Sequence, residues 1–303
     1  MHRAGSLASS THQFYKDEDA ELLVTTEAAK TITTLLSSLL LKNERATDGP
    51  VAWCSANEEG LVFSVELANT MRATARLSRA LFTEWRLCDD VGSQGLGFGV
   101  NLGILVECLR IFSGTEQQQL QLSYNAEKSV LRLTLVEGAA VTDCEVGTLD
   151  TEEIPAVGAS LPGACIVLES ALLTEALQDF QSATDDKDHP RLRLRTGLQP
   201  PQLSLLVTSD DVGCEITYPP TALTSFDVSG ELEAEYSFPY VRMALRSLKE
   251  SDQTCLRLGE DGLLHLRVRI RAELVEDIFV TYLLSPLMSD EIEEDMSANT
   301  AGG

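Results

Sequence analysis

The chain has no uninterrupted apolar run close to the roughly 20 residues that a membrane-spanning helix needs. Its longest apolar stretch, residues 35–41, is interrupted by serines and is typical of a helix in a water-soluble domain. Residues 1–20 lack the apolar core of a secretory signal, and we expect them to form a disordered leader. The sequence therefore predicts no membrane partner.

Clustered cysteines are also missing. The seven cysteines are widely spaced, their number is odd, and no two of them form a CxxC pair. Metal binding requires grouped ligands, and structural disulfides belong to oxidising compartments. We expect reduced thiols, no metal ion and a location in the cytosol or the nucleus.

Basic residues are scarce. The chain has 23 Lys and Arg against 47 Asp and Glu, which gives a net charge of −24. A phosphate backbone repels such a chain unless its cations are gathered on one surface. The positions of the cations therefore decide whether nucleic acid is a plausible partner.

No catalytic grouping stands out. The four histidines have no neighbouring carboxylate or cysteine that would make a recognisable pair, and the glycines at 92–99 lack the spacing of a phosphate loop. Asp150 and Glu152 have the D-x-E spacing with which some exonucleases hold metal ions, but they follow no apolar strand. We predict no catalytic residue, no metal and no cofactor.

The most informative feature that is present is a long-period repeat. Residues 97–114 and 236–251 each hold a short apolar approach followed by a helix. Residues 26–41 and 169–182 form a second matching pair of helices. Repetition at this distance predicts a duplicated domain.

The repeat and the composition divide the chain into five parts. We predict a first domain at 21–147 and a second at 163–288, joined by a linker at 148–162 that contains two prolines. A leader at 1–20 and an acidic tail at 289–303 flank them. Within each domain short strands follow one another through turns, which predicts antiparallel sheets and an α+β fold with two helices per half.

The helices carry cations opposite their apolar stripes. Arg242, Arg246 and Lys249 stand at i, i+4 and i+7 on the fourth helix, where we expect one basic row. The second helix has Arg110, and the first has Lys30 and Lys42. The third helix has no base, because its polar positions are Glu175, Gln178 and Asp179.

Two further arginine rows alternate with apolar residues on strands. They are Arg191, Arg193 and Arg195, and Arg267, Arg269 and Arg271. A period of two places each row on one face of a sheet. We expect these arginines to pair with acidic residues on neighbouring strands.

Three segments together resemble the DNA sliding clamps, and in particular the checkpoint branch of that family. They are FGVNLGILVECLRIFSG at 98–114, LDTEEIP at 149–155 and FVTYLLSP at 279–286. The first is similar to the N-L-x-x-L-x-x-x-L element of clamp helices, and the last is similar to the closing strand of the clamp fold. The resemblance covers residues 21–288.

This resemblance implies two similar clamp-type domains per chain, with the helices lining the inside of a ring of three subunits and the sheets outside. It implies two other clamp subunits in a heterotrimer, double-stranded DNA in the central hole, a clamp loader, repair and checkpoint partners, and a nuclear location. The DNA-facing residues would be Lys30, Lys42, Arg110, Arg242, Arg246 and Lys249. A groove for partner peptides would border the linker at Leu149, Asp150, Ile154 and Pro155.

The third helix and Glu107 depart from the basic pattern of replicative clamps, which favours a specialised subunit. Three alternatives stay open. One is a homotrimeric replicative clamp, the second is a 3′→5′ exonuclease that uses Asp150, and the third is a two-domain scaffold without a DNA role.

Overall fold

Both halves of the chain have the same order of elements in the computed structural model. The model describes residues 19–41, 49–88, 95–111, 118–137, 140–155, 162–271 and 278–287. The first half contains β1 (Leu22–Thr26), α1 (Ala29–Ser38), β2 (Val51–Asn57), β3 (Gly60–Leu67), β4 (Met71–Ser78), β5 (Glu84–Leu87), β6 (Leu96–Asn101), α2 (Leu102–Arg110), β7 (Gln118–Asn125), β8 (Val130–Glu137) and β9 (Ala140–Leu149).

The second half repeats this order with one change. It contains β10 (Pro162–Glu169), α3 (Ser170–Ala183), β11 (Arg191–Leu198), β12 (Pro201–Thr208), β13 (Gly213–Tyr218), β14 (Ser225–Val228), β15 (Leu232–Ser237), α4 (Phe238–Arg242), α5 (Leu245–Lys249), β16 (Ser251–Gly259), β17 (Leu264–Ile270) and β18 (Phe279–Leu284). The change is that two short helices, α4 and α5, take the place that α2 has in the first half.

Strand pairing repeats as well, and all of the pairs are antiparallel. In the first half β1 lies between β5 and β7, while β7, β8 and β9 follow one another and β6, β2, β3 and β4 form a second row. In the second half β10 lies between β14 and β16, and the other pairs match those of the first half. The exception is the short β6–β9 pair, whose equivalents among the described strands, β15 and β18, are not paired with each other. The α+β class and the duplication predicted from the sequence are therefore confirmed.

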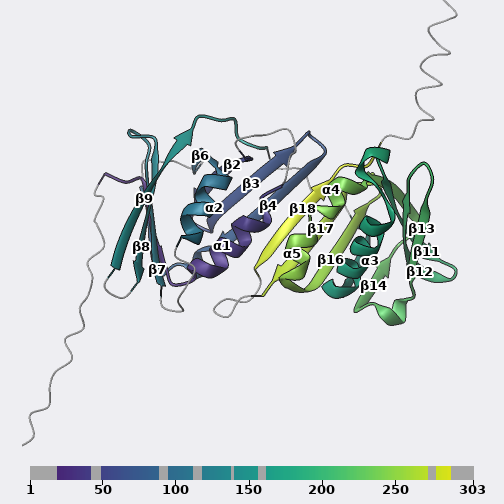
Figure 1. The fold of residues 1–303 in the computed structure, drawn as a ribbon. Coiled ribbons are helices and arrows are strands. Elements are labelled where there is room, and N and C mark those ends of the chain that lie inside the picture. The colour runs from purple at the N-terminus through teal and green to yellow at the C-terminus, as the bar shows by residue number, and fades with distance from the viewer. Residues whose placement is uncertain are drawn as a thin grey trace, which may run out of the picture.

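One strand pair joins the halves. β18, near the end of the described chain, pairs with β4 of the first half, and Thr281 lies opposite Thr74. This pair, called the junction below, extends the sheets of both halves into one 14-stranded sheet, beside which β13-β12-β11-β15 forms a separate four-stranded sheet. Figure 1 shows the helices on one face of the strands around the junction. We call this the helical face and the opposite side of the same strands the outer face.

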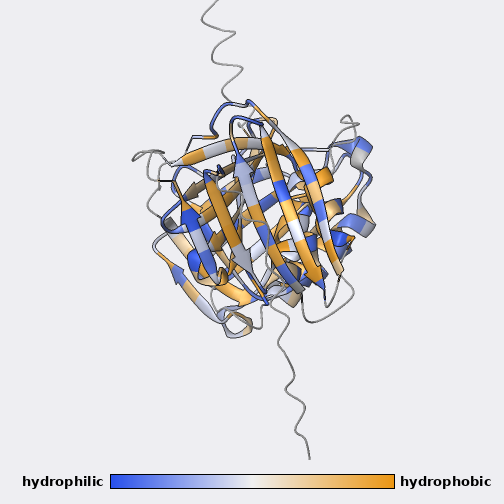
Figure 2. Cartoon of the chain, turned by 90° about the vertical axis from the view of Figure 1, so that its left-hand side faces the viewer, coloured by the Kyte–Doolittle hydropathy of each residue, from blue (hydrophilic) through white to orange (hydrophobic). Residues whose placement is uncertain are grey.

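Amphipathic patterns explain how these layers pack. Ile32, Leu35 and Leu36 of α1 are at most 1% exposed, because their spacing places them on one side of the helix. Along the strands the period is two, and Figure 2 shows blue and orange residues alternating on the sheet at the first-half end. Each strand can therefore turn one set of side chains to the core and the other to solvent.

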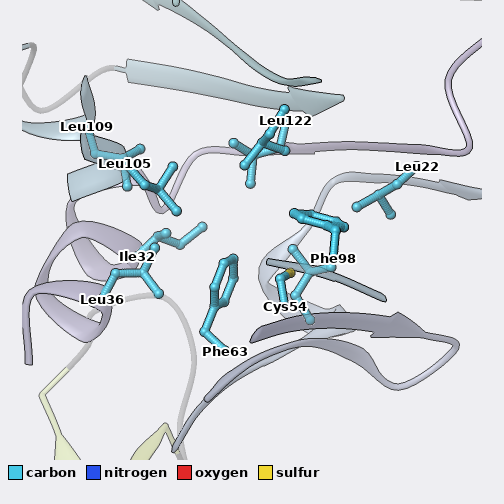
Figure 3. Close-up of a pocket in the computed structure, with 11 residues that line it drawn as sticks. Leu22, Ile32, Leu36, Cys54, Phe63, Phe98, Leu105, Leu109 and Leu122 are labelled. Carbon is cyan, nitrogen blue, oxygen red and sulfur yellow. The ribbon is translucent and has the colours of Figure 1, made fainter. Parts of the chain in front are cut away.

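The core of the first half closes around a very small apolar cavity. Figure 3 shows Ile32 and Leu36 from α1 and Leu105 and Leu109 from α2 converging on strand residues such as Phe63. The cavity measures about 10 Å³, which is at the lower limit for one water molecule, and its lining is apolar. It is a packing defect of the core and offers no room for a ligand.

The fourth predicted helix is interrupted, which corrects the prediction of one continuous element. α4 ends at Arg242 and α5 begins at Leu245. The amides of Met243 and Ala244 donate to Tyr240 and Val241, three residues back, at 3.1 Å each. These i−3 bonds tighten the chain into a turn and end the α-helical ladder.

The ends of the predicted leader and linker also differ from the sequence-based limits. Ala20 is buried and the Asn125 side chain donates to the Asp19 carbonyl at 3.3 Å, so packing starts before residue 21. Thr148 and Leu149 still belong to β9 and pair with Val100 and Gly99. Lys42 and the tail at 289–303 lie outside the described residues.

A buried tyrosine ties the helices of both halves to the junction. Tyr282 on β18 is 0% exposed, and its hydroxyl donates to the Ser38 carbonyl at the end of α1 at 3.1 Å. The same oxygen bonds to the Ser247 hydroxyl on α5. Burial raises the pKa of Tyr282 well above its usual range, so the phenol stays protonated and neutral.

We predict that Tyr282→Phe lowers the free energy of unfolding by about 1–3 kcal/mol, because it leaves buried partners on α1 and α5 unsatisfied. Urea denaturation followed by circular dichroism measures this change. Tyr240→Phe is the control, since the Tyr240 hydroxyl has no hydrogen bond to another described residue. Equal stability of both variants would contradict a structural role for the Tyr282 hydroxyl.

Candidate DNA-facing surface and linker

The predicted DNA-facing cations lie on the helices of the helical face. Lys30 is exposed in the first turn of α1, and Arg110 lies in the last turn of α2. Arg242 ends α4 and is partly buried, whereas Arg246 and Lys249 on α5 are exposed. Because the chain turns between α4 and α5, the three cations of the predicted row belong to two short helices instead of one.

Two arginines from different halves lie near enough to each other at the junction for their charges to interact. Partial burial lowers the pKa of Arg246, and the positive charge of Arg110 lowers it further. Arg110 is held in place by bonds to Glu107 Oε1 at 2.9 Å and to Ser37 Oγ on α1 at 3.2 Å. Two guanidinium groups that repel each other favour an anion placed beside both of them.

The N-terminus of α2 explains how the clamp-like motif positions Arg110. Asn101 precedes the helix in extended conformation, and its side-chain oxygen accepts a hydrogen bond from the Ile104 amide at 3.1 Å. This is an N-cap, which fixes where the helix begins. Leu102, Leu105 and Leu109 then face the core, so Arg110 falls at the end nearest α1.

Other parts of the helical face are not basic. On α3, Glu175, Gln178 and Asp179 are exposed, as the sequence suggests. Ile104 on α2 and Ile111 directly after it are 52% and 64% exposed, and the sequence pattern did not single out either residue. The face is therefore basic near the junction, partly apolar on α2 and acidic on α3.

The linker crosses the outer face of the first half after β9 ends. The Arg72 guanidinium on β4 donates to the Pro155 carbonyl and pairs with Glu66 at 2.6 Å. Leu149 is 44% exposed, Asp150 and Pro155 are exposed, and Ile154 is partly buried. The linker thus offers side chains to a partner, and its role as a peptide-binding groove stays a prediction.

The D-x-E pair has no further metal ligands beside it in the described chain. Asp150 and Glu152 are both exposed after the last residue of β9. No group of three or more His, Cys, Asp or Glu side chains that could hold a metal ion occurs among the described residues.

None of the described helices is long and apolar enough to cross a membrane.

The strand arginines behave in two different ways. Arg193 bonds to Glu235 at 2.8 Å, Arg191 lies 3.7 Å from the same carboxylate, and Arg271 pairs with Asp252 at 2.8 Å. The prediction of cross-strand pairing is confirmed for these three. Arg267 instead lies over the ring of Phe279 at 3.6 Å.

β9 and β13, at opposite ends of the molecule in Figure 1, each have an edge that is unpaired over all or most of its length in the described chain. β13 pairs only with β12 among the described strands, and β9 pairs with β8 and, at its last two residues, with β6. In the repeat, β13 corresponds to β4 and β9 corresponds to β18. The strands that pair at the junction therefore have equivalents whose edges are free within the described chain.

Solved structures with this arrangement are sliding clamps. The proliferating cellular nuclear antigen of Entamoeba histolytica is similar with a TM-score of 0.72 at 14% identity, over 89% of this chain and 100% of that chain. The PCNA2–PCNA3 complex of Sulfolobus tokodaii is similar with a TM-score of 0.68 at 16% identity, over 87% and 98%. The fold is that of a sliding-clamp subunit.

Curated relatives narrow the class. The human cell cycle checkpoint protein RAD1 is 23% identical over 93% of this chain and 96% of its own length. The DNA damage checkpoint control protein rad1 of Schizosaccharomyces pombe is 24% identical over 78% and 79%. The family model described as repair protein Rad1/Rec1/Rad17 matches residues 21–270, and the chain belongs to this family.

A glycine lets the linker pass close to the sheet, and this contact can be tested. A Cβ atom on Gly99 of β6 would lie 2.5 Å from Thr151 Oγ1 and 3.0 Å from the Leu149 carbonyl oxygen. We predict that Gly99→Ala displaces the linker and raises hydrogen exchange at the amides of residues 150–154. Gly147→Ala is the matched control, because no heavy atom lies within 4 Å of its Cβ position. Unchanged exchange in Gly99→Ala would show that the linker is not held by this contact.

Proposed function

We propose that this chain is one subunit of a heterotrimeric checkpoint clamp that encircles double-stranded DNA in the nucleus. In this proposal a clamp loader places the ring at damaged DNA, and the ring then recruits checkpoint-signalling and repair proteins. The sliding-clamp fold and the checkpoint and repair names of the relatives support it.

The observation that carries the proposal is that cations of both halves, Arg110 on α2 and Arg246 on α5, lie on the helical face of a chain with a net charge of −24 and are near enough for their charges to interact. These cations are gathered there although acidic residues outnumber basic ones. Phosphate contacts of this kind position a ring without reading the base sequence. Lys30 and Lys249 extend the same face, and Arg242 supplies a further cation beside them.

Ring closure would use the open edges of β9 and β13. At the junction, β4 and β18 form an antiparallel pair within one chain. Their equivalents in the repeat, β13 and β9, have exposed and partly exposed side chains along nearly their whole length. Pairing β13 of one subunit with β9 of the next would continue the sheet from chain to chain and remove both edges.

The acidic α3 favours a heterotrimer over a homotrimer. In a homotrimer the exposed carboxylates Glu175 and Asp179 would face the hole three times and repel the DNA. In a heterotrimer this surface occurs once, and the other subunits can supply cations opposite it.

We propose that the chain acts without catalysis. Asp150 and Glu152 are exposed side chains of the linker, where a partner can approach them. Two-metal chemistry instead needs several fixed carboxylates around metals about 4 Å apart. Metal-dependent digestion of 3′ ends by the pure chain, abolished in Asp150→Ala, would contradict this part of the proposal.

The lining role is tested by reversing Arg242, Arg246 and Lys249 to Glu. We predict that rings with this subunit leave closed-circular DNA about tenfold faster or more, because these side chains would no longer bind phosphates. The slope of the logarithm of the DNA-binding constant against the logarithm of salt concentration should become shallower by about one for each phosphate that is no longer bound. To measure both effects, rings are loaded on a nicked plasmid, and the plasmid is then closed with ligase. The fraction of rings that stays with the DNA in size-exclusion chromatography is measured at two salt concentrations.

The matched control reverses three exposed cations away from the helices, namely Lys128, Arg195 and Arg269. It changes the net charge equally, so a general charge effect would weaken retention in both variants. Equal retention of the helical-face variant and the unmodified ring would remove the lining role.

The oligomer is tested by the native mass of the purified chain. We predict that the chain alone gives no stable trimer and that trimers form only with two different co-purifying clamp subunits. Native mass spectrometry at micromolar concentration distinguishes these states. A stable trimer of this chain alone would support a homotrimeric replicative clamp, whereas a persistent monomer with no clamp partner would support a scaffold without a ring.

A further inference from the structure

A basic pocket lies on the outer face at the junction, on the side of the sheet away from the helices. It has a volume of about 500 Å³ and includes side chains from both halves of the chain. Its titratable lining comprises Arg76, Arg257, Arg267, His265 and Glu59. None of these residues belongs to the helical face or to the linker.

Strand register explains why the cations gather there. On β4, Ala75 faces the core and is 0% exposed, so Arg76 points to the outer face. On β17, His265 and Arg267 alternate with buried leucine and valine in the same way. Since β18 lies between β17 and β4, pairing at the junction brings Arg76 of the first half within two strands of Arg267.

The three arginines are not neutralised by the described part of the chain. Among the described residues none of them forms an ion pair with a carboxylate, in contrast to Arg72, which pairs with Glu66. Arg267 stacks on Phe279, and this cation–π contact holds its guanidinium at the pocket without pairing it with a carboxylate. Arg257 bonds to the thiol of Cys255, which raises the pKa of Arg257.

His265 adds a buried polar atom without a partner. Its Nε2 is shielded from solvent and has no hydrogen bond to another described atom. Burial lowers the pKa of His265, and the charge of Arg257 lowers it further, while Asp261 acts in the opposite direction. A buried polar atom without a partner is costly, and a ligand in the pocket would remove this cost only if the His265 ring turned to expose Nε2 to it.

These features fit a compact dianion. Neighbouring strands lie about 4.8 Å apart, so the backbones of β4 and β17, with β18 between them, are separated by about 10 Å. Arginine side chains from two strands at this distance can both reach one phosphate group. Arginine forks match the oxygens of phosphate and donate to it in pairs. We propose that this pocket binds a phosphoserine or phosphothreonine in a segment of a partner protein.

Charge around the pocket favours a single phosphate over a nucleic acid strand. Glu59 lines the pocket and Glu58 is exposed beside it, while Asp261 lies close enough to act on His265. A strand of DNA would have to place further phosphates over these carboxylates. A phosphorylated peptide places one dianion in the pocket and neutral or basic residues around it.

The acidic tail of the chain itself is a weaker candidate. It follows Leu287, whereas the pocket lies at the other end of β18, beside Phe279 and Thr281. A chain spans about 3.3 Å per residue, so about six residues would be used merely to run back along β18. Most of the carboxylates between 290 and 295 would lie along that path instead of in the pocket.

The proposal concerns the outer face and is independent of DNA in the hole, so the purified full chain suffices to test it. The probe is a fluorescein-labelled degenerate nonapeptide library with one fixed central phosphoserine, and its binding is followed by fluorescence anisotropy. We expect it to bind, and we expect the same library with serine to bind at least about tenfold more weakly.

Variants locate the binding. Arg76→Ala combined with Arg267→Ala should weaken binding about tenfold or more, and the corresponding lysine pair, which keeps the charge but loses the forks, should give an intermediate loss. Arg195→Ala removes an exposed strand arginine from the other sheet and should change nothing. Addition of the phosphoserine library should also shift the ring resonances of His265 in histidine-labelled chain.

Several results would overturn the proposal. Equal binding of the serine and phosphoserine libraries would contradict it. So would an equal loss of phosphoserine binding in the Arg76/Arg267 variant and in the Arg195 variant. Tighter binding of a nine-nucleotide single strand than of the phosphoserine library would assign the pocket to nucleic acid. If the phosphoserine library bound only to a chain that ends at Leu287, the acidic tail would be the group that occupies the pocket in the full chain.

Discussion

The antiparallel pair of β4 and β18 is the constraint on which the rest of the structure depends. It joins strands of the two halves into one 14-stranded sheet, although the paired strands are about 200 residues apart in the sequence. Tyr282 secures the pair from the helical side by bonding to both α1 and α5. This one contact brings Arg110 near Arg246, and it places Arg76 and Arg267 around one pocket.

Much of the fold could be predicted because it depends on local patterns. Apolar residues at helical spacing identified the helices, and the repeat predicted that both halves would share one architecture. The resemblance to sliding clamps agreed with the solved structures and the family match. The positions of the cations on the helices could also be predicted, because the apolar side of each helix must be buried and the cations lie on its other side.

The rest depends on contacts that a sequence pattern does not contain. Periodicity tells which side of a strand is apolar but not which distant strand lies beside it, so the pairing of β4 with β18 was not predicted. The turn at Met243 and Ala244 was missed because both residues are compatible with a helix. The pocket around His265 was missed because its arginines come from both halves, and Arg76 stands out only beside Arg267.

The register of the junction sets two surfaces at once. Because successive residues of a strand point to opposite faces, a shift of one residue between β4 and β18 would break the match that places Tyr282 under the helices and Arg76 beside Arg267. The two faces are therefore not free to change separately. A substitution in β4 or β18 that shifts the register in favour of one face would misplace the side chains of the other face. We therefore expect the junction to tolerate less sequence variation than either of the two surfaces.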